Sequence, residues 1–365
     1  QEVIELLCRN SRTPMERRGD LSAQLAAIRT GERRLQEIVT RYGLLLVREH
    51  MNELMNYSER LMRACILSIP DGTYDFTDYM DDDGISNEPI PLVVTVEISK
   101  DEVTMDFSKT AEQRPGCVNT PPAVATSTAL YVMLCLASES IPSNHGCLRP
   151  IHVIAPKGSL VNALPPHAVS GGNVETSQRI VDTLFGALAK ALPEKVPAAS
   201  QGTMNNLLVG GHHPEHDTPY VYYETIAGGM GGRPTKDGLD AVQAHMTNTM
   251  NTPVEALEFQ FPMRVVRYAV RYGSGGAGRH RGGHGIIREM EFLAPARVTV
   301  ISERRRFQPY GLHGGHPGES GENVLIRMGL EEMPLNPKST FDVLPGDMLR
   351  IATPGGGGWG AMHGP

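Results

Sequence analysis

Hydrophobic positions near the N-terminus recur with the spacing of amphipathic helices. Apolar residues fall every three or four positions, first over Leu21–Tyr42 and then over Val47–Ile66. Asp20 is a candidate N-cap for the first helix, and Gly43 separates the two. The second stripe is rich in methionine, which is typical of core packing and not of a cofactor contact. The pattern therefore predicts a helical pair within residues 1–70.

The hydrophobic period changes after Gly72. Leu92–Ile98 and Val103–Phe107 are β-prone runs on either side of Lys100-Asp101, which predicts a hairpin. Longer apolar stretches rich in small residues follow, and these predict buried helices. The two predicted helices are Ala123–Ser138 and Thr176–Ala191.

The last hundred residues alternate short β-prone runs with Gly/Pro turns, a rhythm typical of a β-rich domain. Together these patterns predict an α+β fold. We expect a helical segment over 1–70, a central α/β region over 71–263 that carries the polar motifs, and a β-rich domain over 264–365. The predicted C-terminal strands are Val265–Val270, Ile286–Phe292, Val298–Ile301, Asn323–Ile326 and Met348–Ile351.

Composition narrows the functional classes. A net charge of −7 argues against a nucleic-acid or anionic-membrane surface as the main partner. No apolar run approaches the roughly 20 residues of a membrane helix. The five cysteines form no C-x-x-C pair, which favours a reducing cytoplasm. Because the sequence begins with Gln, we expect a processed N-terminus or a piece of a longer protein.

Two charged runs have structural interpretations. Glu303-Arg304-Arg305-Arg306 lies between apolar stretches, which favours a salt-bridged strand end or a subunit contact over a phosphate track. Asp81-Asp82-Asp83-Gly84 lacks the ligand spacing and distal Glu of a calcium loop, so it predicts a solvated turn.

Nucleotide-binding motifs are excluded. Gly273–Gly278 matches G-x-G-x-x-G, but the following RHRGGHG does not predict the helix that a dinucleotide fold requires. A Walker A loop is also excluded, because the sequence contains no Gly-Lys pair. If ATP takes part in the reaction, this chain does not bind it through a Walker A loop.

Two clusters are weaker candidates for chemistry. His212, His213, His216 and Asp217 could bind a metal, but the flanking prolines favour a flexible surface loop. In an extended segment, the side chains of His145 and Cys147 would face the same side of the chain, and a nucleophilic Cys–His pair requires this arrangement. A buried, inert core cysteine is the alternative, and it is the more common case.

The tract Ser170–Gln178, SGGNVETSQ, is a stronger candidate. Its glycines lead into a predicted helix N-terminus, where free N–H groups can hold a carbonyl or a developing oxyanion. Asn173, Glu175 and Gln178 would orient the bound group. A capping box, with Glu175 bonded to the backbone, explains the same residues equally well.

The tract from Gly228 to Pro253 combines glycines with neutral hydrogen-bonding side chains. Gly229 and Gly231 allow close backbone approach, and His245, Asn248 and Asn251 follow among small residues and methionines. This composition suits a site for a neutral, carbonyl-rich molecule. A tight turn with local Asx-type hydrogen bonds is the structural alternative.

Ten tracts follow one another in order from Arg12 to Gly360. They are RTPMERRGDLSAQLAAIRTGERRL, IPDGTYDFTDYMDDDG, NHGCLRPI, SGGNVETSQR, PAASQGTMNN, YYETIAGGMGGRP, HMTNTMNTPVE, GSGGAGRHRGGHGIIRE, ISERRR and TPGGGGWG. Together these tracts resemble the hydantoinase B/oxoprolinase family. One departure lies in Asp106–Thr110, where the family more often has Gly in the place of Lys109, and it affects only the geometry of that turn.

The resemblance implies a B-type subunit that works with an actin-like ATPase subunit to open cyclic amides such as hydantoins, 5-oxoproline or lactams. ATP would be used on the partner subunit. The resemblance also implies a divalent metal, whose ligands we expect outside this chain, on a preceding segment or a separate chain. Related members carboxylate ketones, and a non-catalytic scaffold is a third possibility. Within the matching tracts, we expect Glu175 and His245 to be catalytic and six residues to bind substrate: Asn173, Gln178, Gly229, Gly231, Asn248 and Asn251.

Overall fold

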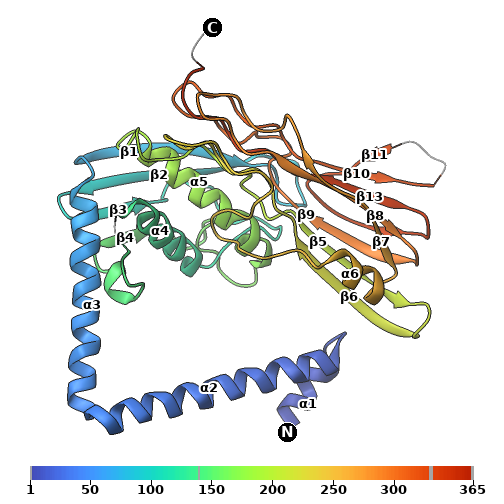
Figure 1. Cartoon of the computed structure of the whole chain (residues 1–365), viewed down its shortest axis with the longest axis horizontal. Coiled ribbons are helices and arrows are strands. Elements are labelled where there is room, and N and C mark those ends of the chain that lie inside the picture. The colour runs from blue at the N-terminus through green and yellow to red at the C-terminus, as the bar shows by residue number, and fades with distance from the viewer. Residues whose placement is uncertain (1, 139, 329–331, 363–365) are drawn as a thin grey trace.

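The computed structural model describes residues 2–138, 140–328 and 332–362. These residues form helices and three β-sheets, so the predicted α+β class is confirmed (Figure 1). The helices are α1 (Glu2–Arg9), α2 (Pro14–Tyr42), α3 (Leu44–Leu67), α4 (Pro122–Leu136), the 3₁₀ turn η1 (His145–Leu148), the π-helix η2 (Gly172–Thr176), α5 (Ser177–Leu188) and α6 (Val254–Gln260). The strands are β1 (Gly72–Met80), β2 (Ile90–Ser99), β3 (Glu102–Asp106), β4 (Ile151–Ile154), β5 (Asn206–His213), β6 (Thr218–Thr225), β7 (Met263–Arg271), β8 (Gly285–Phe292), β9 (Ala296–Ile301), β10 (Glu322–Ile326), β11 (Glu332–Pro334), β12 (Lys338–Val343) and β13 (Met348–Ala352).

The two N-terminal helices break where the sequence predicts. Gly43 adopts a positive φ of 83°, which glycine tolerates, and its N–H bonds to the carbonyl of Val39. The predicted N-cap at Asp20 is wrong. The helix begins earlier, with Pro14 in its first turn, where a missing N–H has no cost, and Asp20 instead pairs with Arg17 on the helix surface.

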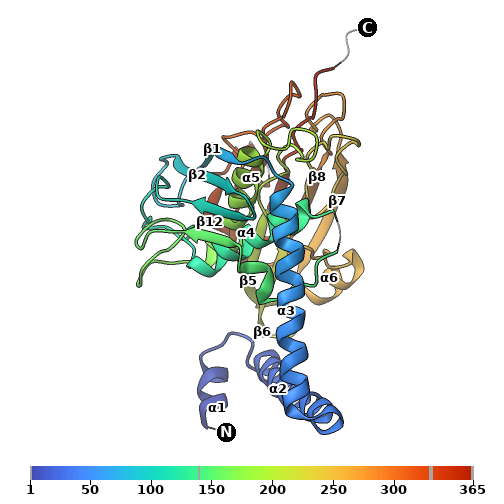
Figure 2. The same ribbon diagram turned by 90° about the vertical axis from the view of Figure 1, so that its left-hand side faces the viewer.

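The helical pair forms an arm (Figures 1 and 2). Only the C-terminal half of α3 enters the core, through Met62 and Ile66. The prediction that the whole methionine-rich stripe is core is therefore wrong, because Met51 and Leu54 are about half exposed. None of the residues of α2, all of which the structure describes, is buried.

The first sheet has the order β1-β2-β3-β4 and carries the larger core. The predicted hairpin is confirmed as the antiparallel pair β2–β3, with Lys100 at positive φ in the turn. Helix α5 packs on β1 and β2, and α4 packs on α5. Both predicted buried helices are thus present, with α5 ending at Leu188. All twelve residues of α5 are buried.

The other two sheets contain every strand predicted after residue 264. Their orders are β11-β10-β13-β8-β7 and β12-β9-β5-β6. Strands β5 and β6 come before residue 263 but join this part of the fold, since Asn206 of β5 pairs with Ile301 of β9. Hydrogen bonds therefore cross the boundary expected between the central region and the β-rich domain. Gly273–Gly278 lies in the loop between β7 and β8, with no helix after it.

The glycines of the 228–232 tract approach other backbone segments closely. The N–H of Gly229 donates to the carbonyl of Pro354, and the N–H of Gly232 donates to that of Gly357. A Cβ at Gly229 would lie 2.0 Å from the carbonyl oxygen of Gly283, and one at Gly231 would lie 1.9 Å from that of Ala198. These contacts tie the tract to the glycine-rich C-terminal segment.

Replacing Gly229 by Ala should therefore lower the free energy of unfolding by about 3 kcal/mol, the upper end of the range for overpacked sites. The neighbouring atoms are backbone, which cannot rotate away. Urea denaturation measures the effect. Gly19→Ala is the matched control, because nothing lies within 4 Å of that position in α2. Equal stability of the two variants would contradict the packing described above.

Candidate functional site

A π-helical turn, η2, leads directly into α5. Helical backbone already begins at Ser170, so the free N–H groups lie one turn before the predicted N-terminus near Glu175-Thr176. The capping-box alternative is excluded, because the Glu175 carboxylate accepts hydrogen bonds from Asn206 Nδ2 at 2.6 Å and from the N–H of Met204 at 3.3 Å. Single π-turns inside helices occur often at functional sites.

Glu175 is fully buried, and its second carboxylate oxygen has no hydrogen-bond partner among the residues that the structure describes. Burial, and next the negative charge of Glu303, raise the pKa of Glu175 to about 8. At neutral pH this group therefore holds a proton. Because Glu175 does not line the cavity described below, any effect of this residue on a substrate would pass through its neighbours.

Glu175→Gln should remove part of the pH dependence of stability. A carboxyl group whose pKa is higher in the folded chain favours folding at low pH, and this contribution is lost as the pH rises from about 4.5 to about 8. Between pH 6 and 8, the native protein should lose about 2 kcal/mol more stability than the variant, as measured by urea denaturation. Parallel pH profiles would contradict the protonated state. Turnover by the same variant tests the predicted catalytic role of Glu175.

The structure brings together two of the tracts singled out in the sequence. Gln178 is buried in α5, and its Nε2 donates to the carbonyl of Ala244 at 3.0 Å. Ala244 directly precedes His245 and lies 66 positions after Gln178 in the sequence, so this hydrogen bond joins two distant parts of the chain. The 170–178 and 228–253 tracts therefore meet at α5.

The remaining predicted binding residues lie elsewhere. The side chains of Asn173 and Asn248 are exposed. Asn251 donates to Glu224 at 2.8 Å and accepts from Tyr268 at 2.9 Å, so it belongs to a separate polar group on β6 and β7. These three residues do not join Gln178 and His245, and their role in binding stays a prediction.

His245 is held in an uncommon position. Its backbone φ is 62°, which for a residue other than glycine is sparsely populated. Its Nε2 lies 3.4 Å from Asp182 Oδ1, and its Nδ1 lies 3.4 Å from the hydroxyl of Tyr131. The ring also packs against Phe185, with centroids 5.6 Å apart. An imidazole flanked by a carboxylate and a hydroxyl is suited to accept and pass on a proton.

A buried ionic network fixes Asp182. Arg304 Nη2 lies 2.7 Å from Asp182 Oδ2 and 2.9 Å from Asp78 Oδ2, and all three residues are buried. Burial would raise the pKa of Asp182, but the contacts with His245 and Arg304 outweigh it and hold the pKa below its ordinary value. Asp182 therefore stays ionised beside His245.

The network confirms one sequence interpretation and overturns another. The 303–306 run is salt-bridged at the end of β9, as predicted, with Glu303 also paired to Arg179 and Lys338. The predicted solvated turn at residues 81–83 is wrong, because all three aspartates are buried. Asp81 accepts from the N–H of Arg305, and Asp83 accepts from the N–H groups of Ile85 and Ser86.

A cavity of about 440 Å³ opens at His245. Tyr131 and Phe185 supply aromatic walls from α4 and α5, while Met230 and Gln243 come from the 228–253 tract. Its remaining lining residues include three charged side chains, Glu194, Lys195 and Arg233. A space of this size that combines aromatic walls with polar and charged side chains suits a small cyclic molecule with carbonyl groups.

The weaker candidates have structural roles. His145 and Cys147 lie in the 3₁₀ turn η1, so the extended geometry expected for a nucleophilic pair is wrong, and Cys147 is buried. Residues 214–217 form the β5–β6 turn, where the rings of His213 and His216 stack 4.3 Å apart and His212 lies 3.3 Å from Asp217.

Within residues 2–138, 140–328 and 332–362, no three or more His, Cys, Asp or Glu side chains are grouped so that they could hold a metal ion. Over the same ranges, no helix has the length and hydrophobicity needed to cross a membrane.

Sequence comparisons cover the whole chain. The profile of the family described as Hydantoinase B/oxoprolinase matches residues 1–362. An uncharacterised protein of Methanocaldococcus jannaschii is 38% identical over 363 residues, which are 100% of this chain and 62% of that protein. The 5-oxoprolinase 1 of Arabidopsis thaliana is 38% identical over 94% of this chain and 27% of its own length. The chain thus spans less than two thirds of the relatives it matches.

Solved structures show the same fold. The ATP-dependent caprolactamase of Pseudomonas jessenii aligns with a TM-score of 0.89 at 29% identity, over 99% of this chain and 64% of that one. A nucleotide-free acetone carboxylase aligns with a TM-score of 0.79 over 89% of this chain and 50% of its own, but at 18% identity this likeness concerns the fold alone. On the full-length profile match, the chain belongs to the hydantoinase B/oxoprolinase family.

Proposed function

We propose that this chain is the B-type subunit, or the C-terminal part of it, of an ATP-dependent hydrolase that opens cyclic amides. The observation that carries the proposal is the meeting of the 170–178 and 228–253 tracts at the His245 cavity through the Gln178–Ala244 hydrogen bond. The names of a related 5-oxoprolinase and of the caprolactamase support the substrate class.

In the proposed reaction, two residues near the cavity, His245 and Asp182, have separate roles. An amide is a poor electrophile because resonance delocalises its nitrogen lone pair, and transfer of a phosphoryl group from ATP to the amide oxygen makes the carbon open to attack by water. His245 takes the proton from that water as the new C–O bond forms. Asp182 orients the imidazole and stabilises its charged form, as the contact of 3.4 Å allows. The ring C–N bond then breaks as the ring nitrogen takes up the proton, which leaves an acyl phosphate on the opened chain. A second water molecule hydrolyses the acyl phosphate and releases inorganic phosphate.

ATP binding belongs to a second subunit in this proposal. The chain has no Walker A loop, and the family resemblance implies an actin-like ATPase partner. We expect the metal ligands on polypeptide outside this chain, in a preceding segment or a separate chain. The five cysteines are all free, which supports a cytoplasmic location.

An assay of the assembled enzyme tests the proposal. Phosphate release and ring opening are measured with hydantoins, 5-oxoproline and lactams, each with and without the ATPase subunit. We expect at least one cyclic amide to stimulate phosphate release and yield its ring-opened product. Bicarbonate-dependent consumption of acetone or an aryl ketone, with no cyclic amide opened, would establish the carboxylase alternative. Full turnover by a variant with Ala at His245, with the assembly intact, would favour a scaffold.

A further inference from the structure

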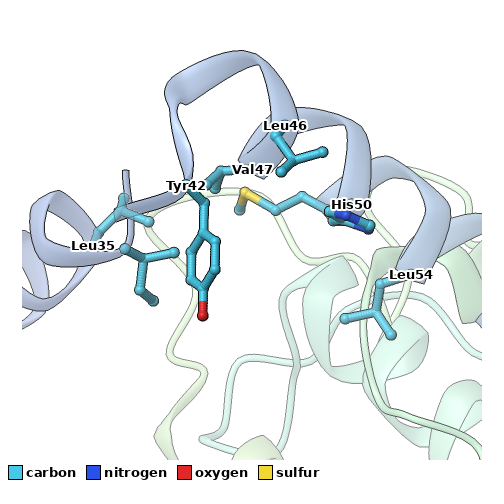
Figure 3. A pocket seen from close by; sticks show the side chains of 8 residues that line it. Leu35, Tyr42, Leu46, Val47, His50 and Leu54 are labelled. Carbon is cyan, nitrogen blue, oxygen red and sulfur yellow. The ribbon is translucent and has the colours of Figure 1, made fainter. Parts of the chain in front are cut away.

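The N-terminal arm carries an apolar surface that the rest of the described chain does not cover. At the bend between α2 and α3, apolar side chains of both helices line a groove of about 620 Å³ (Figure 3). We call it the elbow groove. Its main residues are Leu35, Ile38 and Tyr42 of α2 and Val47, Met51 and Leu54 of α3.

The sequence of α2 is built for helix–helix packing. Its seam residues are spaced alternately by four and three positions, which is the a/d pattern of a coiled coil. Yet Ile28 is 69% exposed, and Leu35 and Tyr42 are each about half exposed. In proteins, most of the stability of a helix comes from packing of its apolar face, so the 29-residue helix α2 with this exposed seam is suited to a packing partner. The seam consists of Leu21, Leu25, Ile28, Glu32, Leu35, Val39 and Tyr42.

The groove faces the body of the protein. Helix α2 turns back beneath the sheets instead of projecting away from them (Figure 1). The labelled side chains Leu35, Tyr42 and Leu54 point from the arm toward that side (Figure 3). An occupant of the groove therefore lies on the side of the arm that faces the body.

A second copy of the arm fits poorly. Glu32 occupies the middle of the α2 seam, between Leu21 and Tyr42. An antiparallel pair of α2 helices would bring the two Glu32 carboxylates together at its centre, and like charges at such a position destabilise the pair.

The comparisons indicate a suitable occupant. The 363-residue match covers 62% of the archaeal relative, which leaves on the order of 220 of its residues outside the match, the size of a domain. The caprolactamase chain is covered to a similar extent, 64%. We propose that the elbow groove is the docking surface for a polypeptide equivalent to this additional segment of the longer relatives, linked to this chain or supplied as a separate subunit.

Site-specific photo-crosslinking in the native assembly tests the proposal. Benzoylphenylalanine replaces Leu35 or Met51 inside the groove, and Arg33 on the outer face of α2 as the control, since its side chain is 66% exposed. Substitutions in α2 leave the core untouched, because no residue of this fully described helix is buried. Mass spectrometry of the crosslinked peptides identifies the occupant.

We expect the two groove positions to crosslink at least tenfold more than Arg33, to peptides that align with the unmatched part of the longer relatives. Crosslinks to a second copy of residues 2–365, crosslinks to a protein unrelated to that segment, or yields equal to the Arg33 control would each overturn the proposal. The readout does not depend on turnover, so it is independent of the function proposed above.

Discussion

Replacing Arg304 by Ala should lower the free energy of unfolding by about 3–5 kcal/mol. Arg304 is fully buried and contacts two buried carboxylates, those of Asp78 and Asp182. Without the guanidinium, the two buried carboxylates lose a positive partner in an environment without water. The free-energy cost of an unpaired buried charge exceeds that of most single substitutions. Urea denaturation of the native protein and the variant measures the difference.

A surface ion pair provides the control. Arg264 pairs with Glu291, but the Arg264 side chain is 57% exposed, so Arg264→Ala should change stability by about 1 kcal/mol or less. If Arg304→Ala were as mild as Arg264→Ala, the buried network would not hold α5 in place as described. Rescue of stability by a second change, Asp78→Asn, would further support the charge-pairing explanation.

Replacing His245 by Asn should reduce kcat by about 10²–10⁴-fold, the usual contribution of a positioned general base. Asn tolerates the positive φ of this position better than most residues, so the backbone is preserved while the titrating ring is lost. The assay is ATP-dependent ring opening by the assembled enzyme, with KM measured alongside. The proposal predicts that the loss falls mainly on kcat.

His212→Asn is the matched control, since His212 lies at the end of β5 with its side chain 55% exposed. We expect that variant to retain full activity. If His245→Asn retained native kcat with its thermal unfolding unchanged, His245 would not be the base.

Local patterns were sufficient to predict most elements of the fold. The break at Gly43, the β2–β3 hairpin, helix α4 and five of the C-terminal strands follow from periodicity and turn residues close in sequence, whereas β11 and β12 were not predicted. Strands β5 and β6 were missed because their glycines, histidines and tyrosines alternate weakly, and pairing with β9 stabilises them. The exposed seam of α2 shows another limit of sequence patterns. An apolar stripe predicts that a helix packs against a partner, but it does not identify the partner.

The candidate site was only partly predictable. Gln178 and His245 were identified by their polar character in small-residue tracts. Gln178 does bond to Ala244, the neighbour of His245 on the cavity wall. Asp182 and Arg304 were not linked, because their contact spans 122 positions and no local pattern encodes it. The available signal was the pair of charged residues Arg179 and Asp182 in a helix predicted to be buried, since a buried charge requires a partner.

A structure of the assembled enzyme with a bound hydantoin or lactam, prepared without ATP so that the ring stays closed, tests the central claim most directly. We expect the ring between Tyr131 and Phe185, with its carbonyl carbon within reach of a water molecule beside His245. A ring bound on another surface of the protein, with the His245 cavity holding only solvent, would contradict this account.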